Sequence, residues 1–286
     1  MKRIFVVLML LLAMLACGKN TEQDKKNSLK KDGANLVVKS KIIAKNELKK
    51  QEGKTSVKEN VKTKDTNKLK KKDNLQKADF NSDVFAAPSK KFSNFVGKWH
   101  IDKDANNLVF AVDGRKWKQG LMAKGIAQKA KAMYGKKYAK FLDNLQAYKY
   151  FPLTIYKNIK EFKNGEITVK FKAISGRIDQ GAGIAFNIKE NGDYLVIRAN
   201  PLEENIVLFK MEKGHRSSVQ WIKNIPHKSH KWYTLRVIIK DNHVLGFLND
   251  KKCIDYKHKS VIKGKIGLWS KADSYVFFDD FTVKSE

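Results

Sequence analysis

The sequence predicts an all-β sandwich of the jelly-roll type that follows a disordered tether and carries one basic helical insertion. Three observations predict it. Apolar and polar residues alternate in short runs after residue 166, turn residues separate these runs at regular intervals, and residues 17–91 contain almost nothing that a core could bury. We therefore expect a signal peptide at 1–16, the tether at 17–91 and the sandwich at 92–286.

The first residues are typical of an export signal. Lys2 and Arg3 precede an apolar run at 4–12, which is too short to span a bilayer comfortably. The Leu15-Ala16-Cys17 sequence resembles the bacterial lipobox. That resemblance implies cleavage before Cys17, diacylglycerol on its thiol and an acyl chain such as palmitate on its amine. Cleavage of an ordinary signal near Ala16, beside an incidental cysteine, is the alternative.

Lipidation at Cys17 implies a membrane-anchored protein, because several acyl chains hold a membrane much more firmly than one. Gly18, rather than aspartate, implies sorting to the outer membrane, with the domain facing the periplasm or the cell surface. The segment after Cys17 is rich in Lys, Asn, Asp, Glu, Ser and Thr. It is expected to be a flexible tether with a reach of about 45–50 Å.

Positive charge is spread over both parts of the chain. The formal net charge is +30; residues 18–91 hold 21 lysines against 10 acids, and residues 92–286 hold 36 basic against 19 acidic side chains. Such a surface attracts anionic lipid, acidic polysaccharide or nucleic acid. No nucleic-acid-binding module accompanies the charge, so no specific nucleic-acid partner is expected. Cys253 is the one cysteine of the predicted sandwich, which excludes an internal disulfide there.

The strands are predicted from alternation. Ile167, Val169 and Phe171 alternate with polar residues, as a strand with one wet face requires. The further strand-like runs are 183–188, 194–199, 206–211, 232–239, 244–248, 265–270 and 275–283. Turn residues at 191–193, 213–214, 241–242 and 249–252 separate several of these runs. Eight or so short strands at this spacing are typical of a sandwich or jelly roll.

Residues 119–149 have a different period. Apolar residues recur there every three or four positions among lysines, which predicts a basic amphipathic helix or helix pair interrupted near Gly135. Two interpretations remain: a helix packed over an edge or face of the sandwich, or a helix that binds a membrane surface or a partner.

Four segments carry a family resemblance. They are 179–186 (DQGAGIAF), 193–205 (DYLVIRANPLEEN), 232–237 (WYTLRV) and 264–281, which contains LWSKADS and FDDF. They resemble bacterial concanavalin A-like, laminin-G-like domains, particularly those related to the 3-keto-disaccharide hydrolase domain. The resemblance covers about residues 95–285. It implies the sandwich fold and a carbohydrate-related function, although this fold hosts lectins, hydrolases, lyases and structural modules.

The resembling segments contain the side chains that a sugar site needs. Amide and guanidinium groups bind paired hydroxyls, and an aromatic face packs on the ring. The candidate ligand-binding residues are Asp179, Tyr194, Arg198, Asn200, Asn205, Trp269, Lys271 and Asp273. Each also has a structural interpretation: Arg198 could form an internal ion pair with Asp179 or Glu203, Asn200 and Asn205 could be turn residues, and Trp269 could belong to the core.

Metal and catalytic roles are less well supported. Laminin-G-like domains commonly hold calcium, so the resemblance implies Asp280 as a candidate ligand, with a structural role in a turn as the alternative. A Glu-x-Asp-x-x-Glu pattern, a zinc motif and a nucleophile elbow are all absent from the sequence. No catalytic residue is assigned.

Three functional hypotheses follow. The first is a lipid-anchored protein that presents a carbohydrate-binding domain to a glycan or cell-envelope polysaccharide. The second is a glycoside hydrolase or lyase acting on keto-sugars. The third is an adhesion or scaffold module that binds another protein.

Overall fold

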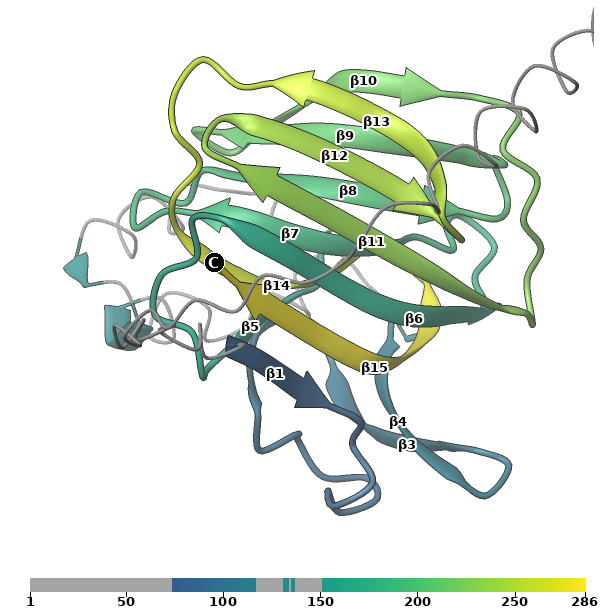
Figure 1. Ribbon diagram of the computed structural model, residues 1–286. Coiled ribbons are helices and arrows are strands. Elements are labelled where there is room, and N and C mark those ends of the chain that lie inside the picture. Colours follow the sequence, from purple (N-terminus) through teal and green to yellow (C-terminus); the bar gives the residue numbers. More distant parts are fainter. Residues whose placement is uncertain (1–73, 117–130, 134, 137–150) are drawn as a thin grey trace, which may run out of the picture. The chain divides into compact units, whose positions relative to one another are not determined.

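Two antiparallel β-sheets stack face to face, which confirms the predicted all-β sandwich (Figure 1). This computed structural model describes residues 74–116, 131–133, 135–136 and 151–286. Across sheet A the strands are β13 (Lys251–Lys257), β12 (His243–Leu248), β11 (Trp232–Lys240), β6 (Gly165–Ser175), β15 (Tyr275–Ser285), β4 (Asn107–Asp113) and β3 (Trp99–Asp104), and β1 (Asn74–Ala78) also pairs with β15. Across sheet B they are β10 (His215–Ile222), β9 (Asn205–Glu212), β8 (Tyr194–Asn200), β7 (Ala182–Ile188), β14 (Lys265–Ser270), β5 (Leu153–Tyr156) and β2 (Phe92–Val96).

The main core lies between the sheets and follows the alternation of the sequence. Ile167, Val169 and Phe171 of β6 are fully buried in it, whereas the intervening polar residues are less buried. Successive strand residues point to opposite faces, so one apolar face per strand suffices to form this layer. The same rule on β8 places Leu195 and Ile197 in this core.

Sheet B is also apolar on its outer face. Tyr194 and Val196 of β8, which alternate with the core residues, join a second cluster with Phe209, Trp269 and other buried side chains. Because this cluster lies on the face turned away from sheet A, β7, β8 and the first half of β9 are buried on both sides. Their sequences therefore read as nearly continuous apolar runs.

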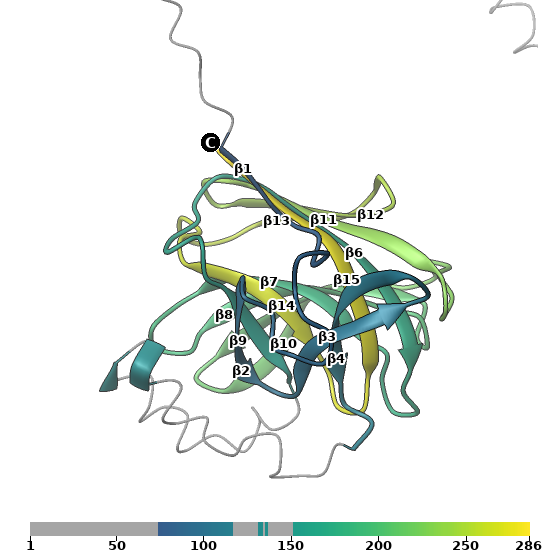
Figure 2. The same ribbon diagram turned by 90° about the horizontal axis from the view of Figure 1, so that it is seen from below.

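The sandwich begins before the predicted boundary at residue 92. Strand β1, which lies in the predicted tether, pairs with β15 from Asn74↔Ser285 to Ala78↔Phe281 (Figure 2). Ala78 and Phe80 are buried in the main core. Leu69–Glu286 forms one compact unit with its own core, so a fragment of these residues is expected to fold by itself. The signal peptide, Cys17 and the tether up to residue 73 lie outside the described residues.

The predicted helical insertion, 119–149, lies largely outside the described residues. Of its described positions, 131–133 and 136 have helical backbone. Met133 packs against the second cluster, on the outer face of sheet B. This contact is the one expected of a helix packed over the sandwich. Within the described ranges, no helix is long and apolar enough to cross a membrane.

Candidate functional site

One row of side chains crosses the outer face of sheet B. The strand registers place Trp269 opposite Gly183, Gly183 opposite Arg198, Arg198 opposite Val207, and Val207 opposite Trp221. Directly opposed residues share a face of the sheet, so the row runs over five strands, from β14 to β10. Its two ends differ: Trp269 is fully buried, whereas Trp221 on the edge strand β10 is 46% exposed.

Arg198 lies in the middle of this row and forms a buried polar network. Its guanidinium donates from Nη1 and Nη2 to Glu203 Oε2 at 3.2 and 3.1 Å, and from Nη1 to Asn205 Oδ1 at 2.9 Å. The Asn205 amide donates to the same Glu203 oxygen at 2.8 Å. The Arg198 side chain is 1% exposed, but that of Glu203 is 38% exposed. The network thus reaches solvent through a carboxylate.

The buried Nε of the Arg198 guanidinium is an unused donor, with no acceptor among the described residues. A buried donor without a partner is costly, and ordered water or a ligand oxygen commonly satisfies it. The five-donor guanidinium therefore has hydrogen-bonding capacity that its protein partners do not use.

Asp179 joins this network from the other side. Its Oδ2 lies 2.5 Å from Lys271 Nζ, and its Oδ1 accepts from Asn200 Nδ2 at 3.1 Å. A Cβ at Gly181 would lie 2.9 Å from Asp179 Oδ1 and 3.4 Å from Arg198 Cδ, so Asp179 and Arg198 approach each other across this glycine. Burial raises the pKa of Asp179, and the charges of Lys271 and Arg198 only partly oppose that effect.

The pKa of Glu203 is shifted in the direction opposite to that of Asp179. Burial alone would raise its pKa, but the Asn205 hydrogen bond and the Arg198 charge outweigh burial and hold the pKa below its usual range. The pKa values of the two carboxyl groups in the network are therefore shifted in opposite directions.

Asp273 has a structural position. Its carboxylate accepts hydrogen bonds from the backbone amides of Arg177, Ile178 and Asp179 at 2.8 to 3.1 Å. This contact holds the loop before β7 against the loop between β14 and β15, and so places Asp179 beside Lys271. Asp273 therefore holds this loop, and its ligand-binding role stays a prediction.

Trp269 and Tyr194 lie in the interior of the second cluster. The indole Nε1 of Trp269 donates to the Tyr194 hydroxyl at 3.1 Å, and its ring stacks on Phe151 at a centroid distance of 5.4 Å. Burial raises the pKa of Tyr194. Both side chains are almost fully buried, so Trp269 does not form an exposed stacking wall, and the core alternative describes it.

The exposed aromatic of this face is a residue that the sequence analysis did not select. Trp221 packs edge-to-face on Phe209 at 6.0 Å, and the Arg216 guanidinium lies over Phe209 at 4.5 Å. The signal was a single tryptophan in an otherwise polar strand, HRSSVQWI. An exposed aromatic ring on a polar edge strand indicates a binding surface, whereas an aromatic residue within an apolar run is usually buried.

Asp280 does not fit a calcium site. Its Oδ1 lies 3.2 Å from Lys77 Nζ and its Oδ2 lies 2.9 Å from Lys170 Nζ, so ammonium groups occupy both oxygens. The neighbouring Asp279 accepts from Asn107 and from the Asp280 amide. Nowhere in the described ranges do three or more His, Cys, Asp or Glu residues form a group that could hold a metal ion. The ion pairs of Asp280 favour the alternative, a structural role next to β1.

Comparisons with known proteins extend only to the fold. No family model and no curated protein sequence matches the chain. Among solved structures, the chain is similar to the carbohydrate-binding module CBM66 from Bacillus subtilis, with 14% identity, coverage of 71% of this chain and 100% of that one, and a TM-score of 0.49. It is also similar to a β-glucanase from Bacillus licheniformis, with 8% identity, coverage of 74% and 92%, and a TM-score of 0.40. At these identities and TM-scores the similarities do not assign an activity.

Proposed function

We propose that this protein is an exported, lipid-anchored carbohydrate-binding protein that holds a glycan on the outer face of sheet B, between Trp221 and Glu203. The observation that carries the proposal is the row from Arg198 to Trp221. It combines the exposed ring of Trp221 on the edge strand with the buried guanidinium of Arg198 two strands away, whose partner Glu203 reaches solvent. This is the combination that pyranose rings require, because their C–H faces pack on aromatics and their hydroxyl pairs bind planar polar groups.

The proposed anchor agrees with where the site lies. Asp273 lies just before β15 begins at Tyr275. At the other end of β15, its last residue, Ser285, pairs with Asn74. An 11-residue strand spans about 35 Å. The chain that leads back to Cys17 therefore joins the sandwich at the end of β15 opposite to the Asp179 network. Anchoring through Cys17 would leave this network free to meet a glycan of the cell envelope.

A glycan array on residues 69–286, with and without calcium, tests the binding proposal. Trp221→Ala should weaken retention of the bound glycan by about tenfold or more, because the stacking surface is lost. Phe85→Ala is the matched control, since Phe85 is likewise an exposed aromatic at 52% but lies away from the row. Equal retention by the Trp221 and Phe85 variants, or no retained glycan at all, would contradict the proposal.

A second pair of variants tests the polar half of the site. Glu203→Gln keeps the shape of the side chain but removes the charge, and should reduce glycan affinity by about tenfold. Glu161→Gln, an ion-paired and similarly exposed glutamate at the opposite end of the sandwich, should leave affinity unchanged.

A glycoside-processing enzyme is the second candidate, and the opposed pKa shifts of Asp179 and Glu203 favour it. Glycoside hydrolysis uses one protonated and one ionised carboxyl group. Incubation with 3-keto-glycosides distinguishes the two functions. An enzyme should lose at least about a hundredfold in turnover on Glu203→Gln while substrate affinity survives. Asp179 is completely buried, so a substrate cannot reach its carboxyl group directly. For this reason we give glycan binding as the first candidate and catalysis as the second.

A further inference from the structure

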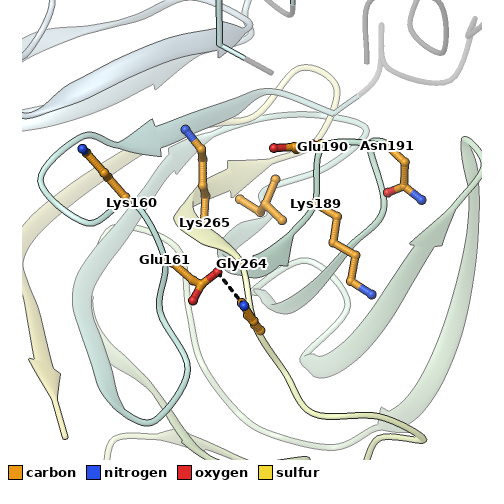
Figure 3. A pocket seen from close by; sticks show the side chains of 9 residues that line it. Lys160, Glu161, Lys189, Glu190, Asn191, Gly264 and Lys265 are labelled. Carbon is orange, nitrogen blue, oxygen red and sulfur yellow. Dashed lines mark ion pairs between the residues drawn. The ribbon is translucent and has the colours of Figure 1, made fainter. Parts of the chain in front are cut away.

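A pocket lies at the end of the sandwich that is opposite to the Asp179 network. It has a volume of about 440 Å³ and is bordered by the loop before β6, the β7–β8 turn and the start of β14 (Figure 3). Four lysines line it: Lys160, Lys189, Lys263 and Lys265. Figure 3 shows Lys160 and Lys265 on one side of the pocket and Lys189 with Asn191 on the other. We call this the basic pocket.

The walls of the basic pocket are held by backbone hydrogen bonds. Phe162 N donates to Gly264 O at 2.8 Å and Gly264 N donates to Phe162 O at 3.2 Å, which fixes the loop before β6 against the start of β14. The Lys263 amide donates to the buried Asn187 side chain at 3.1 Å. The lysines therefore project from a rigid frame.

Lysines outnumber acidic side chains in the lining of the basic pocket. Glu161 forms ion pairs with two lysines at once, Lys263 at 3.2 Å and Lys163 at 3.4 Å, so one carboxylate serves two ammonium groups. Glu190 is the other acid of the lining. With four lysines against two carboxylates, the pocket attracts anions.

The basic pocket adjoins the site where the tether meets the sandwich. A neighbouring pocket shares Lys160 and Glu161 with it and is also lined by Asn74 and Ser285. Asn74 is the first residue of β1, and 56 residues separate it from Cys17. The described chain thus begins next to its lysine-lined pocket.

We propose that this end of the sandwich docks on the headgroups of an anionic phospholipid membrane, with Lys160, Lys189, Lys263 and Lys265 as phosphate ligands. Lysine is suited to this role, because it attracts phosphate as a compact point charge without demanding a fixed geometry. This docking rests on the anchor at Cys17 that the proposed function includes, but it neither requires nor follows from glycan binding at the opposite end, so docking and glycan binding can fail separately.

The membrane is favoured as the occupant by the place where the chain joins the sandwich. If the 56 residues between Cys17 and Asn74 form the flexible tether that the sequence predicts, their r.m.s. span is about 40 Å, which gives even weak headgroup contacts a high effective concentration near an anchor at Cys17. Each lysine near an anionic surface strengthens binding on the order of fivefold. Four lysines acting together should then produce a readily measured affinity that falls with salt.

Co-sedimentation of residues 69–286 with lipid vesicles tests the proposal without the basic tether or the anchor. The fragment should bind vesicles that contain phosphatidylglycerol at low ionic strength, and should bind pure phosphatidylcholine vesicles weakly. Replacing the four pocket lysines with glutamine should weaken the binding by at least about tenfold. Lys160, Lys189 and Lys263 are exposed and Lys265 is half-buried. An unchanged urea midpoint would show that the variant folds.

The matched control replaces four exposed lysines at the opposite end, Lys223, Lys228, Lys231 and Lys251, with glutamine, which changes the net charge equally. It should retain binding within about threefold. Equal losses in both variants would mean diffuse attraction and would overturn the proposal, as would the absence of binding to anionic vesicles. Saturable binding of free glycerol phosphate that the pocket variant abolishes would reassign the pocket to a soluble phosphorylated ligand, and would also overturn it.

Discussion

Arg198 shows how one side chain can serve both stability and recognition. It is among the largest fully buried side chains, and it brings together Glu203 and Asn205 from the β8–β9 turn and the start of β9. Burial of a guanidinium is tolerated only when carboxylate and amide oxygens replace its water. The same geometry that satisfies Arg198 therefore brings Glu203 to the edge of the proposed glycan site.

Arg198→Ala should lower the free energy of unfolding by about 2–4 kcal/mol. The loss should fall below the value for a wholly buried ion pair, because the Glu203 side chain is 38% exposed and water can solvate it. Urea denaturation measures the change. Arg236→Ala is the control: its ion pairs with Glu166 and Asp250 lie at the surface, so the expected loss is below about 1 kcal/mol.

Asp113 predicts a pH dependence at acidic pH. Hydrogen bonds from Arg115 at 2.9 and 3.1 Å lower the pKa of this carboxyl to about 2, against 3.8 when unperturbed. Because the folded pKa is depressed, its stabilisation is complete above the unfolded pKa and is lost as pH falls from about 4 to about 2. The contribution at neutral pH is about 1–2 kcal/mol, after allowance for the 53% exposure of Arg115.

Denaturant midpoints of the wild type and Asp113→Asn, measured at pH 7 and near pH 2, test this dependence. The difference between the two proteins should be present at pH 7 and should shrink at the lower pH. Asp250→Asn, at a side chain that is 94% exposed, should show almost no difference at either pH. A constant difference for Asp113→Asn would assign its effect to shape rather than to charge.

Among the elements, β1 changes the extent of the domain. The strand NLQKA has little apolar character, and its exposed pattern is that of an outer strand. β1 pairs with the second half of β15. This half is available because β4 pairs only with the first half, at residues 275–278. Phe80 then enters the core and stacks on Phe110 at a centroid distance of 5.2 Å. Residues 74–78, near the end of the predicted tether, thus belong to sheet A.

Phe80→Ala in residues 69–286 should lower the free energy of unfolding by about 3–5 kcal/mol, since a buried ring is replaced by a cavity. Thermal and urea denaturation measure this loss. Phe85→Ala, five residues away but 52% exposed, should cost below about 1 kcal/mol. If residues 92–286 alone prove as stable as residues 69–286, β1 and Phe80 contribute nothing and the predicted boundary at residue 92 would stand.

At the scale of the whole molecule, one core joins both sheets. The main cluster contains residues from β1 to β15, so each sheet loses its largest apolar layer when the other unfolds. We expect residues 69–286 to unfold in a single cooperative transition. Tryptophan fluorescence and far-UV circular dichroism should give coincident urea curves, and reducing agent should not shift them because Cys253 has no disulfide partner in the described part of the chain. Two separated transitions would contradict this expectation.

The sequence alone determined the local structure of this protein and its fold class. Alternation at 167–171 and the runs at 194–199 and 206–211 predicted strands that the structure confirms, because side-chain direction in a strand depends only on position along it. Strands β10 and β13 escaped prediction because they lie at sheet edges and carry mostly polar residues. Export and lipidation at Cys17 remain predictions from the sequence.

Only the tertiary structure decided which polar and aromatic residues face solvent. Trp269 is buried and Trp221 is exposed because strand order places one inside sheet B and the other on its edge. Asp273 was predicted to bind ligand, yet contacts with residues about 95 positions away turn it into a loop anchor. The basic pocket likewise gathers lysines from three separate segments. Pairing between distant strands sets these neighbours, and no local pattern encodes it.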